Sequence, residues 1–93
     1  MDNGDTKSME RIEIAIEDFG RLIKDYRKTH NLSLSDMAEL SGLTPSFIWR
    51  IENKRRNPQL ETKIRLLLVM WSTDDIQAYL DRVISKEKEK AQK

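Results

Sequence analysis

Two short helical patterns lie unusually close together in the stretch SLSDMAELSGLTPSFIWR, and this spacing constrains the fold more than any other feature. The first pattern begins at Ser33, an N-cap residue, and Asp36 follows three positions later, close to a capping box. Gly42 suits the left-handed conformation that ends a helix. Thr44 then supplies a second N-cap, and Pro45 stands in the first turn, where its missing N–H costs nothing. The sequence therefore predicts two short helices joined by a tight turn.

The rest of the chain shows helical periodicity as well, with apolar residues recurring at spacings of three and four. Residues 8–29 carry such a stripe and form one helix or two, because Gly20 favours a break or bend and Asn31 suits the end of a helix. Further helices are predicted from about Leu60 to Met70 and after the capping residues Ser72 or Thr73. Residues 1–7 and the last nine residues lack an apolar stripe and are expected to fray. No strand pattern is present, so the fold class is all-α.

Each predicted helix has a predicted buried side. The members are Met9, Ile12, Ile16, Phe19, Ile23 and Tyr26; Leu34, Met37, Ala38 and Leu40; Phe47, Ile48 and Ile51; Leu60, Ile64, Leu67 and Trp71; and Ile76, Tyr79, Leu80, Val83 and Ile84. The helix over residues 60–70 also carries Leu66, Leu68 and Val69 on its other sides. A helix that is apolar around most of its circumference is usually buried on more than one side. We therefore expect a partner surface there.

Composition narrows the function. The chain has 93 residues, no cysteine and a net charge of +1, which fits one domain without disulfides or thiolate metal sites. Its longest apolar run spans six residues, from Leu66 to Trp71, far short of the roughly 20 that cross a bilayer. Charge is segregated, because residues 1–18 hold six acidic and two basic residues, whereas residues 50–65 hold six basic and two acidic ones. This distribution favours a polyanion partner that is met by one face.

The second short helix presents a polar and cationic face. At 100° per residue, Ser46, Trp49, Arg50 and Asn53 fall on one side, and Phe47, Ile48 and Ile51 fall on the other with Thr44. Two helices joined by a glycine turn, with the second offering polar groups outward, have the proportions of a helix-turn-helix. Such a helix fits the major groove of DNA, which is about 12 Å wide.

The stretch from Phe19 to Met70 resembles the Xre, or Cro/C1-type, helix-turn-helix domain of bacterial and phage repressors. The resemblance rests on LIKDYRK, SLSDMAELSGLT, IWRIEN and NPQLET, which occur together and in order. It implies a five-helix, lambda repressor-like domain, here with an N-terminal helical extension and a long C-terminal helix. The expected division is residues 1–18 for the acidic tail and extension, residues 19–71 for the DNA-binding domain, and residues 72–93 for a C-terminal dimerisation helix with a fraying tail.

The resemblance also implies roles for individual residues. It places base contacts early on the recognition helix and on its outward face, with Arg50 as the candidate for bidentate contact to guanine. It implies phosphate anchors at the start of the preceding helix and after the recognition helix. It further implies a structural salt bridge between Arg27 and Glu52. The candidate DNA-binding residues are Ser33, Ser35, Thr44, Pro45, Ser46, Trp49, Arg50, Asn53, Lys54, Arg55 and Arg56.

Two tryptophans depart from the family pattern. Position 49 is usually small, so Trp49 either contacts a thymine methyl or deoxyribose, or lies against another protein. Trp71 replaces a glycine and extends the apolar surface of the second half of the chain. Together with the added helical stripes at both ends, it favours an oligomerisation surface. The candidate interface residues are Leu66, Val69, Met70, Trp71, Ile76, Tyr79, Leu80 and Val83.

The sequence offers no catalytic or metal-binding constellation. The lone His30 stands at a helix end, and the acids of the first helix have the spacing of a solvated face without a nucleophile beside them. We predict no enzyme activity, no metal and no cofactor. The predicted function is a sequence-specific double-stranded DNA-binding transcriptional regulator, a cytoplasmic and nucleoid-associated repressor that acts as a homodimer on an inverted repeat. The alternatives are an antitoxin or anti-repressor with a protein partner, and an accessory DNA-binding protein of a plasmid or conjugative element. RNA binding is a more distant alternative.

Overall fold

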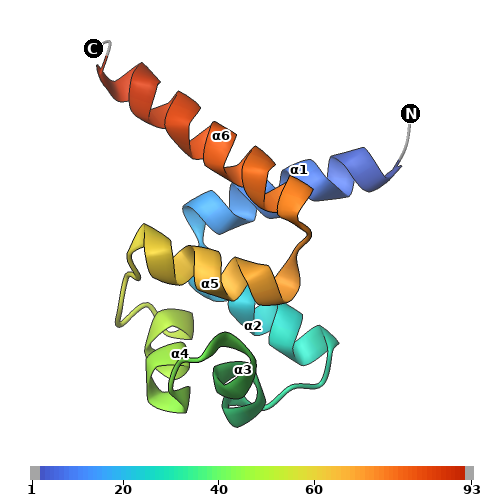
Figure 1. Ribbon diagram of the computed structural model, residues 1–93, viewed down its shortest axis with the longest axis vertical. Coiled ribbons are helices and arrows are strands. Elements are labelled where there is room, and N and C mark those ends of the chain that lie inside the picture. Colours follow the sequence, from blue (N-terminus) through green and yellow to red (C-terminus); the bar gives the residue numbers. More distant parts are fainter. Residues whose placement is uncertain (1–2, 92–93) are drawn as a thin grey trace.

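All regular secondary structure in the described residues is helical, and these residues contain no strand. The structure is a computed structural model that describes the backbone of residues 3–91 and the side chains of residues 8–91. The helices are α1 Asn3–Glu17, α2 Phe19–Thr29, α3 Leu34–Ser41, α4 Pro45–Glu52, α5 Leu60–Met70 and α6 Thr73–Ala91 (Figure 1). The predicted all-α class is confirmed, and the described residues form six helices. The predictions for residues 1–2 and 92–93 lie outside the described range.

Residues 8–29 belong to two helices, and the chain changes direction at Asp18. This residue is the N-cap of α2, and its carboxylate accepts the backbone N–H of Arg21 at 3.3 Å. Gly20 lies inside α2. The residue is a glycine at this point because a Cβ would collide with the carbonyl oxygen of Ile51 in α4. The predicted break at Gly20 was therefore wrong. This glycine allows α2 and α4 to pack closely, and the break falls two residues earlier.

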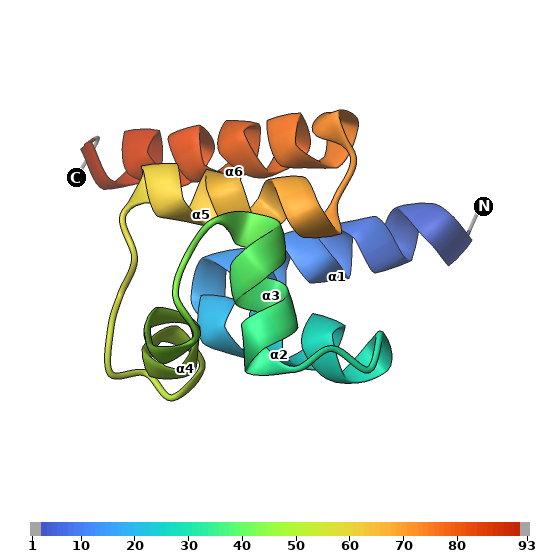
Figure 2. The same cartoon turned by 60° about the horizontal axis from the view of Figure 1, so that its bottom comes forward.

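The helices form two groups that share one core. Helices α2 to α5 make the compact part of the molecule, and α1 and α6 cross each other on the side of α5 that faces away from α3 and α4 (Figures 1 and 2). Ion pairs join α1 to α6: Arg11 pairs with Asp75 at 3.3 Å, and Arg82 pairs with Glu13 at 3.0 Å. The buried apolar core is formed by Ile12, Ala15, Phe19, Leu22, Ile23, Met37, Ala38, Ile48, Ile51, Leu66, Leu67, Ile76 and Tyr79.

Helix α5 is covered on two sides by its own chain. It contacts α3 on one side and α6 on the other, so these two sides need no partner. Leu60 and Leu68 of α5 remain exposed, and a partner surface on this helix stays a prediction. Leu66, Ile76 and Tyr79, which were predicted at an interface, are buried within the chain with exposed fractions of 0%, 6% and 1%. The remaining candidates, Val69, Met70, Trp71, Leu80 and Val83, are only partly buried against this core.

Several local predictions also change. Four residues that were predicted on buried sides are exposed, namely Met9, Leu40, Leu60 and Ile84. Beside Leu40, the small Ser41 is buried, and its hydroxyl donates to the carbonyl oxygen of Met37 at 2.8 Å. The frayed tail expected over residues 1–7 is replaced by helix from Asn3 onward. The last residues also continue α6 as far as Ala91.

Candidate nucleic-acid interface

The turn between α3 and α4 is built by the capping residues that the sequence predicted. Ser33 Oγ accepts the N–H of Asp36 at 3.0 Å, and the Asp36 carboxylate accepts the N–H of Ser33 at 2.9 Å, which completes a capping box. Gly42 has a φ of 72°, the left-handed conformation that glycine adopts without strain. Thr44 Oγ1 accepts the N–H of Phe47 at 3.1 Å, at the start of α4. The capping box begins α3, and Gly42 and Thr44 form the turn that leads from α3 into α4.

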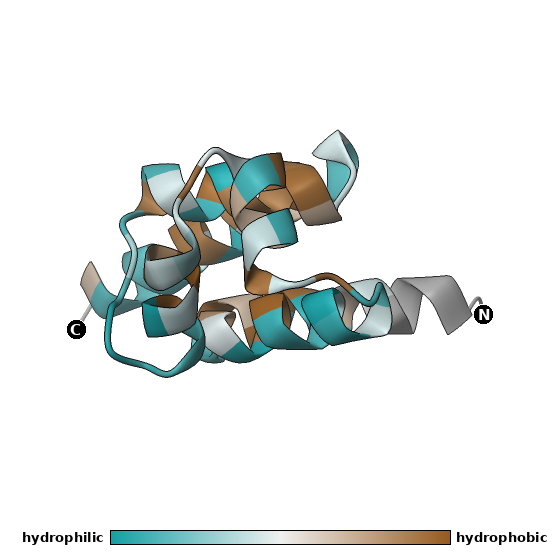
Figure 3. Cartoon of the chain, turned by 90° about the horizontal axis from the view of Figure 1, so that it is seen from below, coloured by the Kyte–Doolittle hydropathy of each residue, from teal (hydrophilic) through white to brown (hydrophobic). Residues whose placement is uncertain are grey.

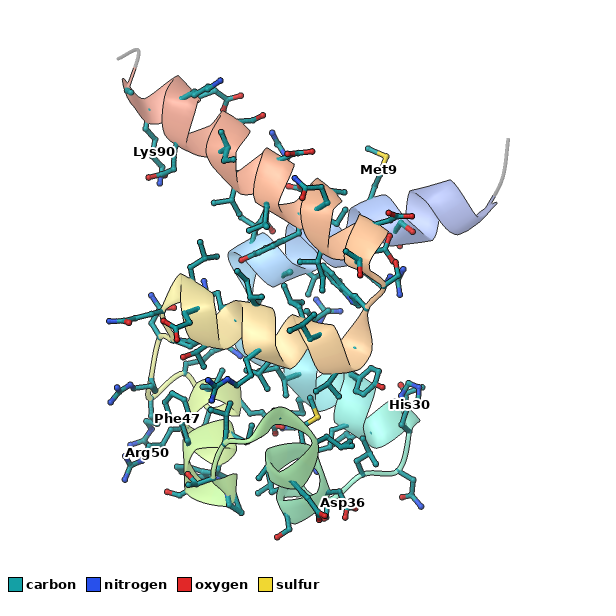
Figure 4. The ribbon with its side chains drawn as sticks, in the orientation of Figure 1. Met9, His30, Asp36, Phe47, Arg50 and Lys90 are labelled. Atoms are coloured by element: carbon teal, nitrogen blue, oxygen red, sulfur yellow. The ribbon has the colours of Figure 1, made fainter. Side chains whose placement is uncertain are left out.

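Helix α4 is divided into a buried and an exposed face. Ile48 and Ile51 are buried at 0% and 2% exposure, whereas Ser46, Trp49, Arg50 and Asn53 are exposed. Figure 4 shows Arg50 at the outer edge of α4, pointing away from the other helices. Phe47 is half-buried beneath Arg56, whose guanidinium carbon lies 5.3 Å from the centre of the ring. The apolar face of α4 therefore anchors it to the core and leaves its polar face free for a ligand.

Every candidate DNA-binding residue is exposed, and together they come from three neighbouring segments. Ser33 and Ser35 stand at the start of α3, the central group lies on α4, and a cationic group follows in the connection to α5. This connection is hydrophilic along its length (Figure 3). Cations in such a position next to a recognition helix suit the phosphates that flank a major groove. The arrangement can bind a duplex without any chemical step.

Some of these side chains already have partners within the protein. Asn53 Nδ2 donates to the carbonyl oxygen of Trp49 at 2.9 Å, so this amide caps the end of α4. Lys54 adopts a φ of 61° and places its Nζ 2.8 Å from Asp18 Oδ1. The hydrogen bond from Lys54 is the main cause that lowers the pKa of Asp18 below its ordinary value. These two residues have local structural roles beside any contact with DNA.

The end of α4 is tied to α2 by a buried ion pair. Arg27 Nε donates to Glu52 Oε2 at 2.8 Å, and a second guanidinium nitrogen donates to Oε1 at 2.9 Å. Arg27 also donates to the carbonyl oxygen of Leu32 at 3.1 Å, in the connection to α3. The hydrogen bonds to Glu52 raise the pKa of Arg27 above its already high value. One guanidinium thereby links α2, the start of the α3 segment and the end of α4.

Sequence reasoning missed two contributors to this region. It treated Asp18 as part of an acidic extension, although the carboxylate reaches the loop after α4 and pairs with Lys54. It counted Lys63 in the basic stretch over residues 50–65 but gave it no site role, although this ammonium lies 5.6 Å from the centre of the Phe19 ring. A partial signal was available for Gly20, since a glycine inside a helical period often marks a close backbone approach. No sequence signal indicated the pairing of Asp18 with Lys54.

Fold and surface together define a small helical DNA-binding domain of the helix-turn-helix class. The comparison with family models supports this, because a family described as Helix-turn-helix matches residues 23–70. The chain belongs to this family of DNA-binding regulators.

Among characterised proteins, the chain is similar to Control protein C.SmaI of Serratia marcescens, with 43% identity over 44 residues. The match covers 47% of this chain and 52% of that protein, so the chain spans about half the length of this relative. No solved structure matches the chain. Within the described residues, none of the helices has the length and apolar character needed to cross a membrane.

Proposed function

We propose that this protein is a sequence-specific double-stranded DNA-binding transcriptional regulator that acts as a repressor. The observation that carries the proposal is the exposed face of α4, where Ser46, Trp49 and Arg50 stand beside a loop that supplies Lys54, Arg55 and Arg56. A helix of this kind enters the major groove with its N-terminal part toward the bases. Repression follows from occupation of a site that the polymerase needs.

The proposed contacts divide into base and phosphate contacts. Arg50 presents a planar fork that matches the O6 and N7 acceptors of guanine, a contact worth about 1 to 3 kcal/mol of discrimination. Thr44, Pro45 and Ser46 approach neighbouring bases, and Trp49 covers a thymine methyl or a deoxyribose. The hydroxyl of Ser33 is already an acceptor in the capping box, but its own hydrogen is free to be donated to a phosphate.

The protein acts as a homodimer in this proposal, and exposed apolar residues on α5 and α6 support a specific surface. Leu60 and Leu68 are 46% and 63% exposed, and together with Ile64 they are spaced four apart along α5. Leu80 and Ile84 form a similar pair on α6, with Ile84 52% exposed. Contiguous exposed apolar residues are characteristic of protein contact surfaces. In this proposal, these exposed residues form the interface in place of Leu66, Ile76 and Tyr79, which the sequence suggested but which are buried within the chain.

Charge on α5 favours a second copy as the occupant. Glu61 and Arg65 are exposed beside the apolar stripe. A two-fold axis that crosses α5 near Ile64 makes the two α5 helices antiparallel, and it brings Glu61 of each copy toward Arg65 of the other. Helix α5 lies between α6 and the α3–α4 pair (Figure 1). The same axis, running from the α6 side toward the α4 side, leaves both recognition helices on one side of the dimer.

The proposed division of labour follows these surfaces. Residues 19–71 bind DNA, residues 72–93 contribute to the dimer, and residues 1–18 support α6 through the ion pairs from α1. Two recognition helices related by the two-fold axis require half-sites about 34 Å apart, or one turn of DNA. The expected operator is an inverted repeat.

Selection of bound sequences from a random duplex library tests this function directly. The expected result is an enriched inverted repeat with half-sites one helical turn apart, and footprints on genomic DNA that overlap promoters. Enrichment without promoter overlap would favour an accessory DNA-binding role. If no sequence is enriched over competitor DNA at physiological salt, the proposed function is wrong, and a protein-binding role such as that of an antitoxin replaces it.

A further inference from the structure

A cleft lies beside the proposed DNA interface, between the α1–α2 junction and the loop that follows α4. Its volume is about 380 Å³. Its charged lining residues are the cations Lys54, Arg56 and Lys63 and the carboxylates Glu17 and Asp18. The cations come from the loop after α4 and from α5. Because they outnumber the carboxylates, the cleft favours an anion at the edge of the recognition helix.

The carboxylate of Asp18 already occupies the cationic side of this cleft. Its Oδ1 lies 2.8 Å from Lys54 Nζ and also accepts the N–H of Arg21 at 3.3 Å. The Lys54 ammonium donates in addition to the carbonyl oxygen of Glu52 at 3.3 Å, so it is held toward the cleft. The side chains of Lys54 and Asp18 are 59% and 37% exposed, which leaves the pair open to exchange with an ion from solvent.

Lys54 is also part of the loop from which Arg55 and Arg56 extend. Its φ of 61° ends α4, and the N–H of Arg55 then donates to the carbonyl oxygen of Arg50 at 2.8 Å. The loop is therefore fixed to the recognition helix by backbone contacts that do not involve Asp18. Removal of the Asp18 charge frees the ammonium without displacing the loop.

We propose that the Lys54 side of this cleft is a binding site for a phosphodiester of the DNA backbone, and that Asp18 occupies it as an internal competitor in the free protein. The inference rests on the proposed DNA-binding function. On binding, Lys54 exchanges the carboxylate for a phosphate, and no covalent bond changes. Because one ion pair is lost as another forms, Lys54 adds little to the affinity of the unmodified protein.

The Asp18→Asn variant tests this proposal, because asparagine also caps helices and keeps the contact with Arg21. A free Lys54 neutralises one more phosphate, so the slope of log K against log salt concentration should steepen by about 0.9. At 0.1 M salt, a change of this size corresponds to binding that is several-fold tighter, up to about tenfold. Binding is measured by fluorescence anisotropy with a labelled duplex over a range of salt concentrations.

Two further variants separate this mechanism from a general effect of charge. Glu10→Gln removes the same charge from the exposed surface of α1, away from the cleft, and should leave the salt slope unchanged. In a Lys54→Gln background, Asp18→Asn should have no further effect on affinity, because the ammonium that Asp18 occupies is gone. Equal tightening in both backgrounds, or equal effects of Asp18→Asn and Glu10→Gln, overturns the proposal.

The outcomes also distinguish this inference from the proposed function. If the unmodified protein binds duplex DNA and Asp18→Asn changes neither affinity nor slope, only the phosphate site is wrong. If neither protein binds any duplex at low salt, the DNA-binding function is wrong and the phosphate site falls with it.

Discussion

Arg27 of α2 and Glu52 of α4, which are 25 positions apart in the sequence, form a bidentate ion pair with nitrogen–oxygen distances of 2.8 and 2.9 Å. The Glu52 side chain is 2% exposed and that of Arg27 is 17% exposed. A buried charge needs this degree of compensation, because water no longer solvates it. The pair holds the C-terminal end of the recognition helix against α2, so the angle of α4 depends on it.

Glu52→Gln should destabilise the fold more than it alters any contact with DNA. The amide keeps the shape of the carboxylate but leaves the Arg27 charge without a counter-ion, and breaking a buried pair on one side costs about 3 kcal/mol. For a domain of this size we expect the midpoint of thermal unfolding to fall by more than about 10 °C. Calorimetry measures it. Glu61→Gln, on the surface of α5, is the control, and equal melting of the two variants would contradict the role of the pair.

Much of the turn and of the recognition helix could be predicted from sequence, because the causes are local. Ser33, Gly42 and Thr44 each act within four residues of their own position, through a cap or a backbone conformation. The exposed and buried faces of α4 follow from its period alone. The predicted limits of α5, Leu60 and Met70, also agree with the structure.

The errors arose where distant segments decide the outcome. The apolar circumference of α5 indicated burial on two sides, but the pattern contains no information on whether α6 or a second molecule supplies the cover. A glycine at position 20 looks the same in the sequence whether it breaks a helix or allows another backbone to pack closely. The close approach of the Ile51 carbonyl oxygen shows that the second case applies. The pairing of Asp18 with Lys54 also depends on how α1 ends relative to α4. Such relationships become visible only in three dimensions.

Arg50→Ala should relax base preference while leaving the dependence on salt nearly unchanged. The expected loss is about 1 to 3 kcal/mol of discrimination at one base pair of each half-site, since a bidentate contact to guanine disappears. Arg50→Lys is the matched variant, because lysine keeps the charge but lacks the planar fork. Competition between the selected operator and single-base variants measures the preference. A uniform loss of affinity on all sequences, with a shallower salt slope, would assign Arg50 to a phosphate instead.

Replacing Arg55 and Arg56 together with glutamine should weaken binding to every sequence alike. Each phosphate contact contributes about 0.9 to the salt slope, so the double variant should lose about 2 units of it. The guanidinium of Arg56 lies over the Phe47 ring. The single variants Arg55→Gln and Arg56→Gln therefore show whether this stacked guanidinium also reaches a DNA phosphate. Titrations at several salt concentrations give the slope. An unchanged slope in the double variant would remove both residues from the phosphate contacts.

Leu68→Glu should dissociate the proposed homodimer. Leu68 is 63% exposed on α5, so the substitution places a charge in the interface without disturbing the core of one chain. Leu40→Glu is the control, because Leu40 is 57% exposed on α3 and outside the proposed contact. Sedimentation equilibrium should find the unmodified protein and the Leu40 variant as dimers and the Leu68 variant as a monomer. A monomeric unmodified protein at micromolar concentration would reject the dimer, and a dimeric Leu68 variant would reject this surface.

Acid should weaken the packing of α1 on α6 through Glu13. The hydrogen bond from Arg82 is the main cause that lowers the pKa of Glu13 below its ordinary value of 4.5, and the charge of Lys86 acts in the same direction. Because the pKa is lower in the folded state, this contribution to stability is present above about pH 4.5 and is lost as the pH falls through the lowered value. Glu13→Gln should therefore melt at a lower temperature than the unmodified protein at pH 7, with the difference shrinking toward pH 3. Glu10→Gln is the exposed control on the same helix, and a difference that stays constant with pH would show that the charge of Glu13 contributes nothing to the packing.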